Sequence, residues 1–237
     1  MPPEVSSDVT ADREVGRIVS KVTIPAGSVE LEGDLVLPES PRGLVVFAHG
    51  SGSSRHSPRN RFVAMALQDG SLATLLMDLL TPAEEQIDSR TAELRFNIDL
   101  LSERLIAAVD WVRKQAAIEV LDIGLFGAST GAAAALVAAA QRPDQVNAVV
   151  SRGGRPDLAG SALPQVRAAT LLIVGGNDLP VLELNRAALQ ELHAEKDLQI
   201  VAGATHLFEE PGALAEVSKL ARQWFETHLR RQHISAA

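Results

Sequence analysis

Two segments near the start of the chain alternate between apolar and polar residues. They are GRIVSKVTIP at 16–25 and SVELEGDLVLP at 28–38. A period of two is typical of β-strands with one buried and one exposed face. The Pro-Ala-Gly sequence at 25–27 suits a hairpin turn. We therefore expect an antiparallel pair of half-exposed strands.

Further along the chain, the pattern changes to short apolar runs rich in valine, isoleucine and leucine. The runs lie at 43–49, 72–79, 121–126, 146–151, 170–176 and 198–203. Nearly continuous runs of this kind are typical of strands that are covered on both faces. Helical segments separate them, several with apolar residues spaced by three and four. These helices are expected at 57–70, 91–115, 130–140, 178–195 and 211–231.

This alternation predicts an α/β protein with a mostly parallel sheet and helices on both faces. The length of 237 residues fits one large domain or two small ones. Residues 1–15 are polar and acidic, and we expect them to be a flexible lead-in to a single domain over 16–237. The segment 78–90 is the longest break between a strand and its helix, and it is too short for a large lid.

Composition and charge argue against nucleic acids and membranes as partners of this protein. Apolar residues make up 46% of the chain and charged residues 22%, which is typical of a soluble globular protein. The net charge of −8 disfavours nucleic-acid binding, which needs a basic surface. No cysteine is present, which excludes disulfides and thiolate sites, and no run reaches the roughly 18 apolar residues of a membrane span. We expect a cytoplasmic protein with neither nucleic acid nor membrane as a partner.

Ligands of parallel sheets bind beyond the carboxyl ends of the strands, and Ser129 lies at such an end. It follows an apolar run, in the sequence Gly127-Ala128-Ser129-Thr130-Gly131, and precedes an alanine-rich helix. G-x-S-x-G between a strand and a helix is typical of a strained turn that presents a nucleophilic serine. We expect a Cβ at either glycine to collide with a neighbouring element. The alternative is a tight turn of small residues with no catalytic role.

A serine nucleophile needs a base, and His206 is the histidine best placed for this role. It lies in a glycine-flanked loop between the last apolar run and the last helix. His193, His228 and His233 lie on or after late helices, where a solvated surface position is the usual one. Asp178 follows another strand and can orient the imidazole. The alternative is a helix-capping role for both His206 and Asp178.

The order of these three residues along the chain adds to the argument. Ser129, then Asp178, then His206 is the order of the catalytic triad in α/β-hydrolases. The chain contains no H-E-x-x-H sequence and no clustered carboxylate ligands, so we expect neither a metal nor another cofactor.

The glycine-rich loop after the run at 43–49 is expected to form part of an oxyanion hole. We assign one donor to the amide of Thr130 and the second to the amide of Ser51, with Gly52 as the alternative second donor. His49 is expected to brace the loop. The loop lacks the sequence of a P-loop, which disfavours a nucleotide site.

Five stretches together resemble a known family. They are VVFAHGSGSSRHSPRNRFVA, LFGASTGAAAAL, VVSRGGRPDLAG, LLIVGGNDLPVLELN and GATHLFEEPGAL. The sequence resembles the α/β-hydrolase superfamily over about residues 17–229, and within it the dienelactone-hydrolase-like group. It is most similar to the serine hydrolase domains that occur attached to phosphoribosyltransferase domains.

The resemblance implies an eight-stranded, mostly parallel sheet whose second strand is antiparallel. It also implies Ser129 as nucleophile, Asp178 as acid and His206 as base, with hydrolysis through an acyl-serine. This sequence differs from those relatives in two features, and each limits which of their properties can be expected here. Dienelactone hydrolases proper have a cysteine at the position of Ser129, so dienelactone does not follow as the substrate. The hydrolase fold uses every segment of the chain, so we expect no phosphoribosyltransferase domain within it.

A set of basic residues lies near the predicted strand ends. The candidates for substrate binding are Arg55, His56, Arg152 and Arg155. A guanidinium group binds carboxylate or phosphate through two parallel hydrogen bonds. The alternative is ion pairing with acids such as Asp78 or Asp157, which we favour for Arg59 and Arg61.

Together these features predict a serine hydrolase that cleaves small, soluble carboxylic esters or lactones through an acyl-serine intermediate. The same residues could serve an amidase, a thioesterase or an acyltransferase. The fold could also belong to a ligand-binding protein with an idle site.

Overall fold

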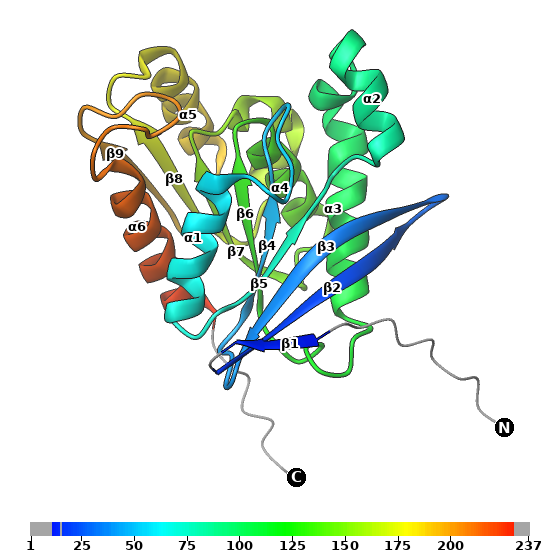
Figure 1. Ribbon diagram of the computed structural model, residues 1–237. Helices are drawn as coiled ribbons and strands as arrows, with labels where there is room; N and C mark the ends of the chain where they lie inside the picture. Colours follow the sequence, from blue (N-terminus) through cyan, green and yellow to red (C-terminus); the bar gives the residue numbers. More distant parts are fainter. Residues whose placement is uncertain (1–10, 15, 230–237) are drawn as a thin grey trace, which may run out of the picture.

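A nine-stranded sheet forms the centre of the computed structural model, which describes residues 11–14 and 16–229. The strand order across the described sheet is β1-β2-β3-β5-β4-β6-β7-β8-β9. The strands are β1 (Ala11–Glu14), β2 (Arg17–Ala26), β3 (Val29–Pro38), β4 (Leu44–Ala48), β5 (Ala73–Met77), β6 (Ile123–Ala128), β7 (Val146–Arg152), β8 (Ala169–Gly175) and β9 (Lys196–Val201). Figure 1 shows the β2–β3 hairpin projecting from one side of the sheet.

The six strands from β5 to β9 along this order are parallel, and the three before them are antiparallel. The predicted hairpin is confirmed, since β2 and β3 pair from Arg17↔Pro38 to Ala26↔Val29. Gly27 makes the turn at a φ of 68°, which glycine adopts without strain.

The expected count of about eight strands omits β1, which lies inside the segment predicted to be a flexible lead-in. The backbone of Ala11–Glu14 pairs with β2, and so satisfies hydrogen-bonding groups at the edge of the sheet. Residues 11–14 thus form an edge strand, and the flexibility expected of this segment stays a prediction. Residues 1–10 and 15, which belonged to the same prediction, lie outside the described residues.

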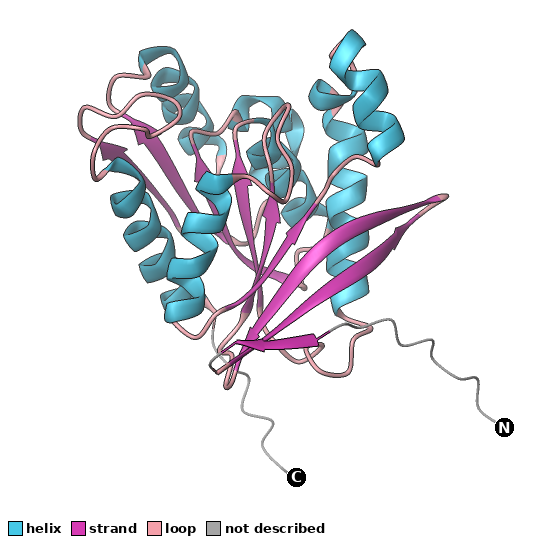
Figure 2. Ribbon diagram, in the orientation of Figure 1, coloured by secondary structure: helices cyan, strands magenta, loops and turns pink. Residues whose placement is uncertain are grey.

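Helices cover both faces of the sheet, as predicted (Figure 2). Helices α1 (Pro58–Asp69) and α6 (Ala213–His228) pack on one face, against side chains that include Val45 and Phe47 of β4. Helices α3 (Ile98–Val112), α4 (Thr130–Gln141) and α5 (Leu179–Glu191) share the other face with Val46. Alternate residues of a single strand thus enter opposite cores, which explains its continuous apolar sequence.

The segment between β5 and α3 differs from the prediction. The supposed break at 78–90 contains helix α2 (Pro82–Thr91), and the helix expected over 91–115 begins only at Ile98. Thr81 and Glu84 form a reciprocal capping box at the start of α2. Asn97 caps α3 by accepting a hydrogen bond from the Leu100 amide at 3.1 Å, after a short 3₁₀ helix, η1 (Leu94–Phe96).

The insertion after β5 is thus limited to α2 and η1, in keeping with the absence of a large lid. A second 3₁₀ segment, η2 (Pro156–Gln165), follows β7. Within the described ranges, no helix has both the length and the apolar character needed to cross a bilayer.

Candidate active site

Ser129 occupies a sharp turn between β6 and α4. Its backbone has a φ of 51° and a ψ of −120°, a conformation that costs a non-glycine residue free energy. A Cβ on Gly127 would lie 2.4 Å from Ala132 Cα, and one on Gly131 would lie 2.4 Å from the carbonyl oxygen of Ala48. The collisions expected at both glycines are therefore confirmed, one against α4 and the other against the end of β4.

Backbone hydrogen bonds hold this turn from two sides. The Ser129 amide donates to the carbonyl of Arg152 at 3.3 Å, which ties the turn to the end of β7. The Ser129 carbonyl accepts from the amides of Ala132 and Arg155, each at 3.1 Å. These contacts with α4 and with the β7–η2 connection fix the position of the serine.

Asp178 and His206 are brought together from the connections after β8 and β9. Nδ1 of His206 lies 2.7 Å from Oδ2 of Asp178. Because an ionised carboxylate only accepts hydrogen bonds, Nδ1 carries the proton and Nε2 stays available as an acceptor. The Asp178 side chain is 13% exposed and that of His206 is 39% exposed, so the imidazole lies between a largely buried partner and solvent.

Ser129 and His206 line one cavity of about 210 Å³. Ser51 and Arg152 also line it, whereas Asp178 contacts His206 without lining it. The structure therefore brings the three predicted triad residues into one place. Their catalytic roles stay predictions.

The loop after β4 is held by His49, which is 6% exposed. Its Nε2 accepts a hydrogen bond from the Leu79 amide at 3.0 Å, and Nδ1 lies 3.0 Å from the carbonyl of Gly50. Burial lowers the pKa of His49, although the Gly50 carbonyl and the charge of Asp78 oppose this shift. The neutral imidazole joins the ends of β4 and β5, as the predicted bracing role requires.

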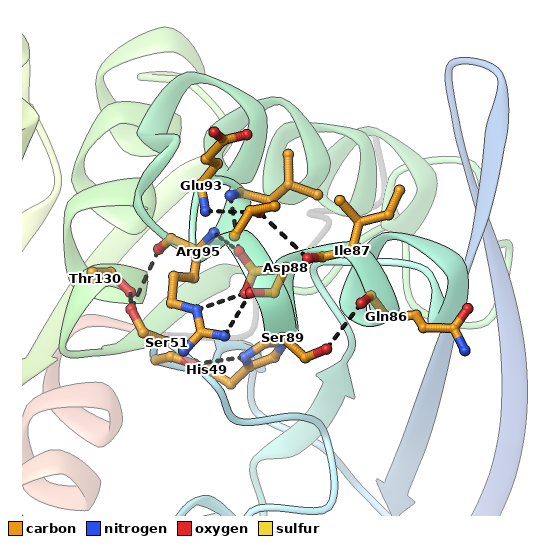
Figure 3. Close-up of polar contacts among 12 residues, drawn as sticks. His49, Ser51, Gln86, Ile87, Asp88, Ser89, Glu93, Arg95 and Thr130 are labelled. Carbon is orange, nitrogen blue, oxygen red and sulfur yellow. Dashed lines mark hydrogen bonds and ion pairs between the residues drawn. The ribbon is translucent and has the colours of Figure 1, made fainter.

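A second, larger cavity of about 600 Å³ lies beside the first and shares four of its lining residues. These are Gly50, Ser51, Ser53 and Ser57. Thr130 lies on the wall of this larger cavity, and its hydroxyl is 3.0 Å from that of Ser51. The Ser51 hydroxyl also donates a hydrogen bond to the carbonyl of Arg95 at 3.3 Å (Figure 3). Arg95 lines the same larger cavity.

Asp88 of α2 organises the far wall of the larger cavity. It is 3% exposed and accepts hydrogen bonds from the amides of Leu94 and Arg95 at 2.9 Å and from Nε of Arg95 at 2.6 Å. These contacts are drawn in Figure 3. Burial of Asp88 opposes ionisation, but the hydrogen bonds and charge of Arg95 lower its pKa overall. Asp88 is not among the predicted site residues, because the pattern at 78–90 predicts a break between a strand and a helix. The Thr-x-x-Glu sequence at 81–84 was the available signal.

Two of the proposed basic substrate ligands lie away from Ser129. Arg55 forms ion pairs with Asp78 and Glu32, and its backbone amide donates to Asp78 at 2.7 Å. Nearby acids thus already pair with the guanidinium of Arg55, in keeping with the alternative of ion pairing, and its role as a substrate ligand stays an untested prediction. His56 is exposed and lines only the larger of the two cavities, where Nδ1 lies 2.7 Å from Nη2 of Arg61.

Arg155 and Arg152, three residues apart, have opposite environments. Arg155 forms two parallel hydrogen bonds with Asp157, at 2.7 and 2.8 Å, so the alternative of ion pairing applies to it. Arg152 is 8% exposed and lines the cavity of Ser129. Its Nη2 lies 3.4 Å from Oδ1 of Asn60, while Nε and Nη1 have no hydrogen-bond partner among the described residues.

Burial is the main reason why the pKa of Arg152 falls to about 10, and the nearby charge of Arg59 adds to the effect. In the part of the chain that the structure describes, no group of three or more His, Asp or Glu side chains is placed to hold a metal ion.

The model of the dienelactone hydrolase family matches residues 62–229. The chain belongs to the dienelactone hydrolase family. A crystal structure of a dienelactone hydrolase from Anabaena variabilis ATCC 29413 matches with a TM-score of 0.89 and 58% identity, covering 91% of this chain and 100% of that one. The predicted family and α/β-hydrolase fold are confirmed.

A relative in Mycobacterium tuberculosis (strain H37Rv), named "Putative phosphoribosyl transferase", is 56% identical over 209 residues. These residues are 88% of this chain and 46% of the relative, so the chain spans less than half of that protein's length. Est1E from Butyrivibrio proteoclasticus matches with a TM-score of 0.73 at 16% identity, over 87% of this chain and 98% of that one, and shares the fold alone.

Proposed function

We propose that this protein is a serine hydrolase that cleaves small carboxylic esters or lactones through an acyl-serine intermediate. One observation carries the proposal: the strained turn of Ser129 and the imidazole of His206, held by Asp178 at 2.7 Å, line the same cavity. This arrangement supplies a nucleophile, a base and an orienting carboxylate in one place.

In the proposed mechanism, the Ser129 hydroxyl attacks the carbonyl carbon while Nε2 of His206 accepts its proton. Asp178 holds the imidazole tautomer and stabilises the imidazolium that forms. The tetrahedral intermediate collapses when His206 protonates the leaving alcohol, and the acyl group stays on Ser129. A water molecule, deprotonated by His206, then releases the acid and restores the serine.

The oxyanion is expected to bind two backbone amides. Thr130 is the first residue of α4, so its amide has no acceptor one turn back in the helix. The positive end of the helix dipole also favours negative charge there. We assign the second donor to Ser51 rather than Gly52, because Ser51 lines both cavities and Gly52 lines only the larger one.

The proposal is tested by intact-mass spectrometry after incubation with a fluorophosphonate. We expect one covalent adduct on the wild-type protein and none on Ser129→Ala, since only an activated serine reacts. Ser53→Ala is the matched control, because this hydroxyl lines the same cavity but is not on the strained turn; it should still form the adduct. An unlabelled, folded wild-type protein would overturn the proposal.

Hydrolysis of a 4-nitrophenyl ester gives the rate. On the serine-triad template, Ser129→Ala and His206→Ala should each lower kcat by on the order of 10⁴-fold or more. Because the members of a triad act as a unit, the double variant should lose little more than either single variant. Multiplicative losses in the double variant would contradict a shared mechanism.

A further inference from the structure

Arg152 carries a positive charge that its surroundings do not neutralise. The residue ends β7, one strand away from β6, where its backbone lies opposite Ala128, the residue before Ser129. Its side chain is 8% exposed, and two of its three guanidinium nitrogens lack a hydrogen-bond partner among the described residues. Buried charges without partners are costly, so a ligand of opposite charge would offset the cost of burying Arg152.

A second guanidinium, from a different element of the fold, lies at the same cavity. Arg59 of α1 also lines it, and its buried Nε has no partner among the described residues. Its Nη1 lies 3.2 Å from Glu209, whose side chain is 66% exposed. The two guanidiniums carry like charges and repel each other. The charge of Arg59 therefore helps to lower the pKa of Arg152.

The N-terminus of α1 faces the cavity as well. This helix has 12 residues, and Ser57, Arg59 and Asn60 from its cap and first turn are among the lining residues. Pro58 has no N–H, and the Asn60 amide donates to the Ser57 hydroxyl at 3.3 Å, so this terminus acts mainly through its dipole, which favours anions. No aspartate or glutamate is among the described residues that line this cavity, so Arg152 has no acid facing it there, while Arg59 pairs with Glu209 outside the lining.

We propose that Arg152, Arg59 and the N-terminus of α1 form a binding site for a phosphoryl group of the substrate, beside Ser129. The unpartnered nitrogens of two guanidiniums and a helix terminus match a phosphoryl group with three free oxygens, whereas a carboxylate offers only two. The phosphoryl group is bound and not transferred. This inference rests on the proposed function for the reaction itself, and names its substrate class as phosphorylated esters or lactones.

The size of the cavity limits where the phosphoryl group sits in the substrate. Ser129 and Arg152 share a space of about 210 Å³. The phosphoryl group is therefore close to the scissile carbonyl, within a few bonds of it. The adjoining cavity of about 600 Å³ accommodates the rest of a larger substrate.

Binding is tested with inorganic phosphate by isothermal titration calorimetry, at constant ionic strength and with acetate as the comparison anion. The protein used is Ser129→Ala, so the result does not depend on catalysis. We expect phosphate to bind, and Arg152→Met or Arg59→Gln to weaken it by about tenfold to a hundredfold, as loss of a charged hydrogen bond implies.

Arg61→Gln is the matched control. It removes the same charge from the same helix, but Arg61 is 50% exposed and pairs with Asp34 outside the cavity. Phosphate affinity should be unchanged in this variant. If Arg61→Gln lost as much phosphate affinity as the other two variants, the effect would come from the overall charge of the protein, and the proposed site would be overturned. Acetate binding as tight as phosphate binding would overturn the phosphoryl assignment. Should Arg152→Met fail to fold, the partly exposed Arg59 gives the same test.

A kinetic readout separates this inference from the proposed function. The substrates are a 4-nitrophenyl ester with a phosphonate on its acyl chain and its neutral isostere. In Arg152→Met, the ratio of kcat/KM for the phosphonate ester to that for the neutral ester should fall by about tenfold or more. An unchanged ratio would overturn the phosphoryl site while leaving ester hydrolysis intact. If the wild-type protein bound phosphate but was not labelled by the fluorophosphonate, the proposed serine hydrolase function would be overturned and the phosphoryl site would stand.

Discussion

Ser129 combines a strained backbone with the expected chemistry. Its φ of 51° and ψ of −120° are tolerated by glycine far better than by serine. Such strain costs on the order of 1–3 kcal/mol. The backbone strain therefore remains when Ser129 is replaced by another L-residue such as alanine, and only glycine relieves it.

Replacement of Ser129 by glycine should stabilise the protein. Relief of strain should exceed the entropy that glycine adds to the unfolded chain, which is about 0.4–1 kcal/mol. We expect Ser129→Gly to have a higher Tm than Ser129→Ala by about 2–4 °C, as 1 kcal/mol implies for a domain of this size. Both variants lack the hydroxyl, so the comparison isolates the backbone. Equal Tm values would mean that the strain is no larger than this entropy term, and a lower Tm for Ser129→Gly would mean that the turn is unstrained.

Arg152 should also lower stability in the absence of a ligand. An unsatisfied buried polar group costs about 1–3 kcal/mol, and Arg152 has two unpartnered guanidinium nitrogens. Arg152→Met keeps most of the side-chain volume and should raise the free energy of unfolding in urea by about 1 kcal/mol or more. Phosphate should reduce this difference, because it stabilises only the protein that binds it. A Met variant less stable than wild type would point to a structural role for the arginine.

Sequence could identify the triad candidates but not the state of each arginine. Ser129, Asp178 and His206 lie at strand ends in a recognisable order, and this is a property of the chain itself. Whether an arginine is free depends on acids from distant segments. Arg55 meets Glu32 across the fold, whereas Arg152 faces a cavity without acids. Such pairing follows from tertiary packing, which the pattern along the chain does not show.

At the scale of elements, α2 and η1 form the wall opposite the oxyanion loop. Asp88 joins the two by accepting three hydrogen bonds from Leu94 and Arg95. The Arg95 carbonyl then contacts the Ser51 hydroxyl, which contacts Thr130. The orientation of the loop beside the candidate oxyanion hole therefore depends on this short insertion.

Asp88→Asn should loosen this wall. Asparagine keeps the shape but loses the charge that strengthens the bonds from Arg95, a loss of about 2 kcal/mol. We expect faster hydrogen exchange at the amides of η1 and a lower kcat with a smaller change in KM. Asp144→Asn is the control, because Asp144 is 90% exposed. Unchanged exchange in η1 would show that Asp88 does not order the segment.

Most elements could be predicted because their apolar spacing is set by the faces they bury. The β2–β3 hairpin alternates with period two, and β4 is apolar throughout because both its faces are covered. The helix start at Ile98 was missed because the apolar spacing continues through Leu94. The Asn97 cap and the hydrogen bonds to Asp88 override that spacing. Edge strand β1 was missed because its sequence, ADRE, has no apolar face.

At the scale of the whole molecule, one buried imidazole links two central strands, β4 and β5, and the segments that follow both strands line the larger cavity. His49 joins the end of β4 to the end of β5 through the Leu79 amide. Protonation of Nε2 would remove the acceptor for that amide and place a charge in a buried position. The stability of the sheet should therefore depend on keeping His49 neutral.

The sign of the resulting pH dependence follows from linkage. The pKa of His49 is lowered by burial from its ordinary value of 6.5, so below pH 6.5 the unfolded chain binds a proton that the folded protein does not. Stability is therefore fully present above pH 6.5 and falls as the pH decreases, by up to about 1.4 kcal/mol per pH unit for this one proton. Urea unfolding from pH 7 to pH 5 should show this slope. His49→Gln, which cannot be protonated, should have a flatter profile, whereas the exposed His193→Gln should keep the wild-type slope. If His49→Gln kept that slope too, the acid sensitivity would have to arise from groups other than the brace between β4 and β5.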